Sequence, residues 1–285
     1  MKNILSALTR RSRATKLLLL FCAGALAFTG ICFAWRTALD TGFASERPLP
    51  PPASKRQPGS ALSVGILGDS WASGGDGSVL SVTLEQELRE RGISAQVRMF
   101  GHPGAKTKQI YKDLFKNPDE AFSAAPLLTD PPEYCFILAG TNDFCSEMGG
   151  EFYARHMRMI ADALAGSGAV PLILELPNLD LARYDVNQAK DGLKNVLRQV
   201  RNRIRGGGRD RAAYVAVLET EILKMGGGVK IIPFALLSSG FDGELRTKDG
   251  IHLTPDAKKH LAKIFADALE SDIKEEKRAL CPKTL

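Results

Sequence analysis

An apolar run passes directly into a polar turn at Val64-Gly65-Ile66-Leu67-Gly68-Asp69-Ser70. The apolar part predicts a buried strand over residues 62–67, because a short continuous run between turn residues is typical of a strand inside a parallel sheet. A second run of this kind, Tyr134-Cys135-Phe136-Ile137-Leu138, leads into Gly140-Thr141-Asn142-Asp143. Both predicted strands therefore end in polar residues that can carry chemistry.

Helical patterns separate the predicted strands along the rest of the chain. Thr254 is a good N-cap for a last helix, with Pro255 at its first position. We expect further strands at 95–100, 170–176 and 214–218, and helices at 79–91, 107–115, 151–165 and 188–205. Strands that are joined through helices run parallel, and the helices cover both faces of the sheet. The sequence therefore predicts an α/β protein, a three-layer α/β/α sandwich with a parallel, doubly wound, flavodoxin-like sheet.

The positive charge of the chain lies almost entirely before residue 60. The formal net charge of the 285 residues is +6. Residues 1–59 carry nine basic and two acidic residues, whereas residues 60–285 carry 29 basic and 30 acidic residues. The globular part is close to neutral, so the sequence does not support a nucleic-acid partner.

The first residues have the pattern of a membrane anchor. Residues 17–35 form a 19-residue stretch without a charged side chain, which is long enough to cross a bilayer as a helix. Five basic residues precede it, which favours a cytoplasmic N-terminus; a cleaved signal peptide is the alternative. We expect a basic cytoplasmic segment at 1–16, a transmembrane anchor at 17–35, a proline-rich linker at 36–59 and the globular domain at 60–285.

The five cysteines suggest no metal site. Cys135 lies within a predicted strand, where a cysteine is most simply a small core residue. Cys145 and Cys281 could form a disulfide if the domain is exported, and this alternative stays open. No Cys/His spacing is typical of zinc, and we predict neither a metal nor a cofactor.

A third segment, Asp249-Gly250-Ile251-His252, completes a set of catalytic residue types. Ser70 could attack an ester carbonyl once a base takes its proton. His252 is the candidate base, and Asp249 could hold its imidazole in one tautomer. Ligands of open α/β sheets bind at the carboxyl ends of the strands, where Ser70 and Asn142 are expected. The pattern therefore favours a serine hydrolase.

Four segments in this order resemble the SGNH/GDSL hydrolase superfamily. They are Ile66–Trp71, Phe100–Thr107, Ala139–Asp143 and Asp249–Thr254, and the resemblance spans about residues 62–270. It implies an oxyanion hole formed by the backbone N–H of Ser70, the backbone N–H of Gly104 and the side-chain amide of Asn142. Trp71 stands where the family usually has leucine.

Other residues near these segments have two interpretations each. Asp69 is interpreted as a residue that braces the loop rather than as the catalytic acid. Trp71 either stacks on a sugar ring or packs in the core. His102 either contacts substrate or is structural. We expect His156 and His260, which fall in predicted helices, at solvent or boundary positions.

The leading functional hypothesis is an extracytoplasmic serine esterase, held in a bacterial inner membrane with its catalytic domain in the periplasm. It would remove acyl groups, acetyl being favoured, from a cell-envelope or extracellular glycan. One alternative is a lipid acyl hydrolase such as a lysophospholipase or thioesterase. A second is an acyltransferase that uses the same residues, and a third is a glycan-binding protein without activity. The oligomeric state is not predicted.

Overall fold

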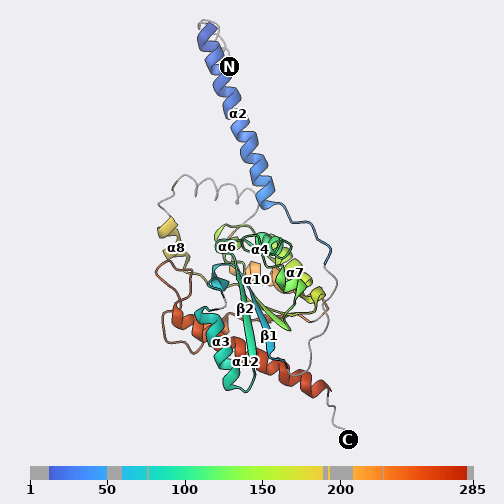
Figure 1. Ribbon diagram of the computed structural model, residues 1–285. Coiled ribbons are helices and arrows are strands. Elements are labelled where there is room, and N and C mark those ends of the chain that lie inside the picture. The colour runs from blue at the N-terminus through green and yellow to red at the C-terminus, as the bar shows by residue number, and fades with distance from the viewer. Residues whose placement is uncertain are drawn as a thin grey trace. The chain divides into compact units, whose positions relative to one another are not determined.

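A five-stranded parallel sheet forms the centre of the globular unit (Figure 1). The computed structural model describes residues 13–49, 60–75, 77–188, 192, 208–226 and 228–280. The strands are β1 (Leu62–Gly68), β2 (Ala95–Gly101), β3 (Tyr134–Leu138), β4 (Val170–Leu174) and β5 (Lys230–Ile232). Their spatial order, β2-β1-β3-β4-β5, is the doubly wound order of flavodoxin-like folds, as predicted.

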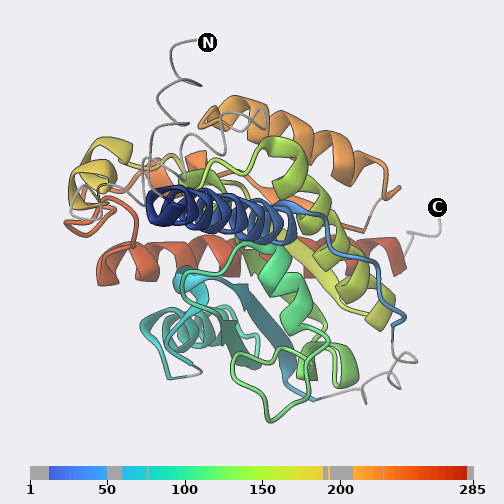
Figure 2. The same cartoon turned by 90° about the horizontal axis from the view of Figure 1, so that it is seen from above.

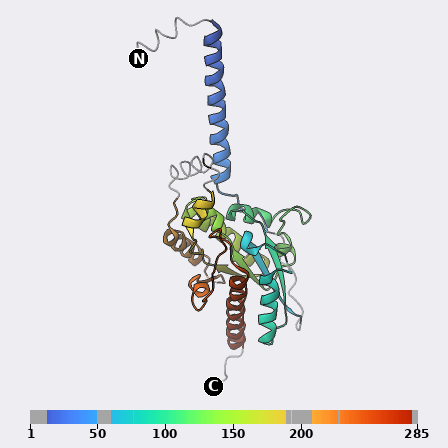
Figure 3. The same cartoon turned by 90° about the vertical axis from the view of Figure 1, so that its left-hand side faces the viewer.

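Helices cover both faces of this sheet. On one face, α3 (Val79–Glu90) lies beside α12 (Pro255–Leu280) (Figure 3), and Phe265 of α12 stacks on Phe136 of β3 with ring centroids 3.9 Å apart. The other face carries α4 (Thr107–Asp113), α5 (Pro126–Thr129), α7 (Gly150–Ser167) and α10 (Arg211–Leu223), and Figure 2 shows α7 next to α10. The predicted three-layer α/β/α sandwich is confirmed.

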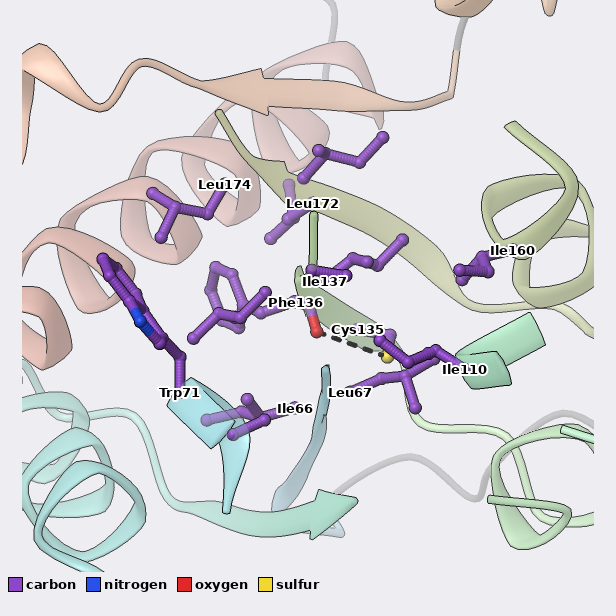
Figure 4. Close-up of a cluster of buried hydrophobic side chains, with 14 of the residues drawn as sticks. Ile66, Leu67, Trp71, Ile110, Cys135, Phe136, Ile137, Ile160, Leu172 and Leu174 are labelled. Atoms are coloured by element: carbon purple, nitrogen blue, oxygen red, sulfur yellow. Dashed lines mark hydrogen bonds between the residues drawn. The ribbon is translucent and has the colours of Figure 1, made fainter. Parts of the chain in front are cut away.

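The central strand explains why its sequence is continuously apolar. Every residue of β3 is buried, because neighbouring strands flank it and helices cover its two faces. Figure 4 shows Cys135, Phe136 and Ile137 of this strand among buried side chains from the adjacent strands and helices. This rigid centre fixes the positions of the loops that follow β1, β2 and β3.

The expected strand at residues 214–218 is wrong, because this segment belongs to helix α10. Asp210 caps the helix by accepting the N–H groups of Ala212 and Ala213. Tyr214, Leu218 and Ile222 are its buried residues, and their spacing of four is helical. A five-residue window that contains two valines cannot reveal that spacing.

The fifth strand is instead β5, which the sequence did not predict. It has three residues, and only the last of them is buried. So short a segment carries almost no periodic signal. The helix expected at residues 188–205 lies outside the described residues, apart from its first residue, which ends α8 (Leu181–Gln188), and the single residue 192.

The chain divides into two compact units, Met1–Phe43 and Ala44–Leu285. The first unit contains α2 (Arg13–Thr41), which includes the predicted anchor. Within the described residues, no helix combines the length and apolarity that a membrane span requires.

The globular unit begins at Ala44, earlier than the expected start at residue 60. The Ala44 N–H donates to Nε2 of His156 over 3.0 Å, and the Arg47 N–H donates to the hydroxyl of Tyr111 over 2.9 Å. Residues 44–49 are thus part of the domain, although the sequence placed them in the proline-rich linker. Residues 36–41 of that expected linker belong to helix α2 instead, and residues 50–59 lie outside the described residues.

His156 is fully buried, so its expected solvent or boundary position is wrong. Burial lowers the pKa of His156 to about 4; its bond to the Phe152 carbonyl works in the opposite direction, and the charges of Lys108, Arg155 and Lys112 lower the pKa further. Nδ1 donates to the Phe152 carbonyl over 2.7 Å, which leaves Nε2 to accept the Ala44 N–H. The neutral imidazole therefore fastens residues 44–49 to α7.

The stability of this attachment should depend on pH. The unfolded chain binds a proton at His156 near the ordinary pKa of about 6.5, whereas the folded protein does so only near pH 4. The free energy of unfolding is therefore highest above about pH 6.5 and falls as the pH is lowered toward 4. Urea unfolding of the wild type and of His156→Gln measures this, because glutamine offers an acceptor that does not titrate.

We expect the wild type to be more stable than His156→Gln at pH 7 by about 1–3 kcal/mol, and the difference to shrink toward pH 5. Taking the difference between the two proteins cancels the contributions of all other titrating groups. A difference that is constant over this pH range would contradict the neutral-imidazole attachment.

Candidate active site

Ser70 occupies the first position after the turn that ends β1. It begins the 3₁₀ helix η1 (Ser70–Ala72), and Asp69 is the N-cap of that helix. The Asp69 N–H donates to the Leu138 carbonyl at the end of β3 over 3.0 Å, and Oδ1 of Asp69 accepts the Trp71 N–H at 3.0 Å. These two bonds fix the turn, so that Ser70 stands at the carboxyl edge of the sheet.

The three residues predicted for catalysis meet there. Oγ of Ser70 lies 2.9 Å from Nε2 of His252, and Nδ1 of His252 lies 2.5 Å from Oδ2 of Asp249. With a proton on Nδ1, the imidazole donates to Asp249 and accepts the Ser70 hydroxyl. Residues 182 positions apart in the chain thus form a Ser-His-Asp triad.

Asp249 is held by more bonds than the histidine bond alone. Its Oδ1 accepts the N–H groups of Ile251 and His252 and the hydroxyl of Thr247, at 2.8–3.0 Å. Partial burial acts to raise the pKa of Asp249, but the hydrogen bonds from His252, Ile251 and Thr247 outweigh it and hold the pKa well below its ordinary value. The carboxylate therefore stays ionised and able to orient His252.

The turn that carries this dyad requires glycine at position 250. Gly250 has a φ of +78°, and a Cβ atom at this position would meet the Asp180 carbonyl oxygen at 2.6 Å. Asp180 also donates its N–H to the Gly250 carbonyl over 3.2 Å. The loop after β4 thus supports the turn that holds Asp249 and His252.

Gly104 lies in a tight turn after β2. Residues 102–105 form this turn, which is closed by a hydrogen bond of 3.0 Å from the Ala105 N–H to the His102 carbonyl. Its second residue is a proline, and its third residue, Gly104, has a φ of +78°. This is a type II turn, which favours glycine at the third position. The glycine is exposed, so its backbone can approach a substrate closely.

Asn142 is the third predicted oxyanion donor. It is the second residue of the short helix α6 (Thr141–Cys145), directly after β3. Its Nδ2 donates to the Ala105 carbonyl over 3.0 Å and to Oδ2 of Asp69 over 3.3 Å. These bonds join the segments that contain Ser70, Gly104 and Asn142. An oxyanion would accept one of the two amide hydrogens. The bond to Asp69 is the longer and therefore the weaker of the two, so it is the bond that an oxyanion would replace.

Two buried carboxylates flank Asn142. Burial raises the pKa of Asp69 to about 7, although the hydrogen bond from the Trp71 N–H acts to lower it. The charge of Asp143 also raises this pKa, and the hydrogen bond from Asn142 lowers it. Burial likewise raises the pKa of Asp143 to about 6, although the bonds from Thr107 lower it. Asp69 has no bond to His252, whose partner is Asp249. The structure therefore supports the interpretation that Asp69 braces the loop.

Asp143 also has a positioning role that the sequence analysis missed. Its two oxygens accept the N–H and the hydroxyl of Thr107 at 2.9 and 2.7 Å. This contact ties the start of α4 to α6 and so sets the distance between Gly104 and Asn142. The only sequence signal was the adjacency of Asp143 to Asn142, which also suits ordinary turn chemistry.

The structure separates the remaining candidates. Trp71 is 3% exposed and packs 6.5 Å from the Phe234 ring, so it belongs to the core and does not stack on a sugar. Its place in the buried cluster is visible in Figure 4. His260 lies in α12 at an intermediate position, stacked on Phe241. Cys145 is buried, and Cys281 lies outside the described residues, so the alternative of a disulfide between them is not tested.

Comparison with known proteins identifies the fold. No protein-family model matches the sequence, and no curated protein matches it. Among solved structures, a lipase/acylhydrolase from Enterococcus faecalis superposes with a TM-score of 0.53 and 15% identity, covering 74% of this chain and 96% of that chain. TesA gives a TM-score of 0.53 and 19% identity over 74% of this chain and 99% of that chain.

The esterase EstA from Pseudoalteromonas sp. gives a TM-score of 0.51 and 11% identity, covering 74% and 98% of the two chains. At these identities the likeness concerns the fold. The chain has the fold of the SGNH/GDSL hydrolases, as its four sequence segments predicted.

Proposed function

We propose that this protein hydrolyses carboxylic esters with Ser70 as the nucleophile. The observation that carries the proposal is the continuous path from Ser70 through His252 to Asp249, with distances of 2.9 and 2.5 Å. A serine hydroxyl becomes a useful nucleophile when a base lies within hydrogen-bond reach and a third group orients that base. The fold shared with lipases and esterases supports the same class of reaction.

The reaction would proceed in two halves. Ser70 Oγ bonds to the ester carbonyl carbon while its proton passes to Nε2 of His252, and the carbonyl electrons move onto the oxygen. As that oxygen reforms its double bond, the alcohol leaves with the proton from His252 and the acyl group stays on Ser70. Water then repeats the sequence, and the acid is released. Asp249 stabilises the imidazolium that forms in each half.

The negative oxygen of each tetrahedral intermediate needs donors. The N–H of Ser70 is at the start of η1, where helix N–H groups have no partner within the helix. The N–H of Gly104 and the amide of Asn142 are tied to the same place through Ala105. We assign these three donors to the oxyanion hole.

We further propose a short acyl group, acetyl above all, carried by a glycan. The triad lies open to solvent, because the side chains of His252 and Asp249 are 48% and 41% exposed. An open site accepts an ester that projects from a bulky polar chain, whereas a long acyl chain gains its binding energy from an enclosed apolar pocket. Fold likeness alone does not choose between these substrates.

We also propose that the catalytic domain lies outside the cytoplasm. Its support is the uncharged stretch 17–35 with five basic residues before it; for a membrane-spanning helix, this charge pattern favours a cytoplasmic N-terminus and a following domain on the other side. A bacterial inner-membrane anchor with a periplasmic domain would bring the site to envelope glycans. Protection of the domain from protease added to spheroplasts would contradict this location.

Acyl-chain preference tests the substrate proposal. For the full-length protein, we expect kcat/KM for 4-nitrophenyl acetate to exceed that for 4-nitrophenyl octanoate by at least about tenfold, which is about 1.4 kcal/mol of transition-state binding. The Ser70→Ala protein supplies the background rate for each ester. A higher kcat/KM for the octanoate would favour the lipid acyl hydrolase instead.

The products distinguish hydrolysis from transfer with the same enzyme. A hydrolase releases one equivalent of free acetate for each ester cleaved, whether or not a sugar is present. An acyltransferase would release less acetate when a saccharide is added and would yield an acetylated saccharide. Mass spectrometry of the saccharide separates the two outcomes.

A further inference from the structure

A second histidine lies at the same edge of the sheet, outside the triad. His102 directly follows β2, and its N–H donates to the Gly68 carbonyl over 3.0 Å. Gly68 is two residues before Ser70, so the backbones of His102 and Ser70 are within about 12 Å of each other. Gly104, an assigned oxyanion donor, is two residues further along the chain. A group bound at His102 would therefore lie beside the reacting ester.

The His102 imidazole is stacked on an exposed aromatic ring. The ring centroids of His102 and Phe122 are 4.1 Å apart and their planes differ by 8°. Phe122 is nevertheless 52% exposed and has a φ of 60°. A positive φ is an outlier for a bulky residue, and such strain persists where surrounding structure enforces it, often at binding sites. Stability alone does not account for an exposed phenyl ring on a strained backbone.

The residues around the stacked pair hold it in place. Oδ2 of Asp113 accepts from Nδ1 of His102 at 2.7 Å, and Oδ1 of Asp113 pairs with Nζ of Lys116 at 2.6 Å. Lys116 also donates to the Ala121 carbonyl, next to Phe122, over 2.9 Å. Asp113 is 3% exposed, so a buried carboxylate connects the histidine to the loop that presents the phenyl ring.

We propose that His102 and Phe122 form a subsite for a sugar ring of the substrate, on the alcohol side of the ester that Ser70 cleaves. The apolar C–H face of a pyranose packs on the exposed phenyl ring, and Nε2 of His102 bonds to a ring hydroxyl. Because Asp113 takes Nδ1, Nε2 is the nitrogen left for substrate. This inference rests on the proposed function and names the substrate group that the same site recognises.

The surroundings favour a sugar over an acyl chain. Polar side chains precede Phe122 in its loop: Lys116 donates to the Ala121 carbonyl, and Asn117 and Glu120 are hydrogen-bonded to each other. The Phe122 ring is 52% exposed, so it cannot by itself enclose a flexible hydrocarbon. A saccharide uses both the ring face and the polar rim.

The test compares a sugar ester with a small ester on the full-length protein. The probes are 6-O-acetylglucose, whose ring hydroxyls are free, and 4-nitrophenyl acetate, with wild type, Phe122→Ala, Phe122→Tyr and His102→Ala. We expect Phe122→Ala to lower kcat/KM for 6-O-acetylglucose about tenfold, mainly through KM, and to leave kcat/KM for 4-nitrophenyl acetate within about twofold of the wild type. Tyrosine keeps the aromatic face, so Phe122→Tyr should restore the rate on the sugar ester. His102→Ala should show the same selectivity.

Leu223→Ala is the matched control, since Leu223 is an exposed apolar side chain (81%) in α10. It should leave both rates unchanged. Equal losses on the two esters with Phe122→Ala, no loss on the sugar ester, or a wild type that cleaves only 4-nitrophenyl acetate would each overturn the subsite. Failure of the esterase proposal would give a different result: the Ser70→Ala variant would still hydrolyse both esters at the wild-type rate.

Discussion

Ser70→Ala should lower kcat for ester hydrolysis by on the order of 10⁴-fold or more, while the protein stays folded. The substitution removes the oxygen that accepts the acyl group and leaves the backbone of η1 intact. His252→Ala should have a similar effect, because the hydroxyl then lacks the base 2.9 Å away. Initial rates with 4-nitrophenyl acetate measure both changes after subtraction of the uncatalysed rate.

The double variant gives the sharper result. When two residues act in the same step, the rate losses caused by substituting each of them do not multiply. The double variant Ser70→Ala/His252→Ala should therefore be no slower than either single variant. His260→Ala and Ser238→Ala are the matched controls. His260 lies in α12, stacked on Phe241, and Ser238 is an exposed residue of α11 (Ala235–Ser238); both variants should retain the wild-type rate. Losses in Ser70→Ala and His252→Ala that multiply would show that the two residues act separately.

Asn142→Ala should lower kcat about 10²- to 10³-fold with little change in KM, the range typical for loss of one oxyanion donor. The reason is that the amide gains strength as a partner only when the carbonyl oxygen becomes negative. Asn142→Asp has almost the same size but replaces the donor with an acceptor, so it should be at least as slow. Steady-state kinetics with 4-nitrophenyl acetate separates the effects on kcat and KM.

Local disruption would give a different signature. Asn142 also bonds to the Ala105 carbonyl and to Asp69, so thermal unfolding must accompany the kinetics. A variant that melts like the wild type and still turns over within about twofold of its rate would remove Asn142 from the oxyanion hole. The assignments of Ser70 and His252 would survive that result.

The residues of the candidate active site could be predicted because their signals are local. Ser70 and Asn142 each follow a strongly apolar strand, and parallel strands bring their carboxyl ends to one edge. Asp249 and His252 are three residues apart, so one turn places them in contact. The alternation of helices and strands along the chain predicted a parallel sheet, and therefore predicted that Ser70 and Asn142 lie at the same edge of it.

The contacts that position these residues could not be predicted in the same way. The bond between Asp143 and Thr107 joins residues 36 positions apart, and the bond between His156 and Ala44 joins residues 112 apart. Each depends on how two elements pack, which no periodicity in either element specifies. The same limit applies to β5, where three residues form a strand only because β4 offers its edge.

The two aspartates near the site show how burial sorts residues that look alike in sequence. Asp249 has bonds that favour its charged form, which keep its pKa low. Asp69 is fully buried beside Asp143, and its pKa rises to about 7. Only the first suits an orienting acid that must stay ionised at neutral pH. The sequence favoured the same assignment, but the physical reason is visible only in the fold.

Labelling with a fluorophosphonate tests the central claim most directly, because this reagent reacts with a serine that a neighbouring base has activated. Mass spectrometry of the digested full-length protein should find one phosphonyl adduct, on the peptide that contains Ser70, and none in folded His252→Ala. Absence of the adduct from folded wild type, or an equal yield in His252→Ala, would contradict the triad.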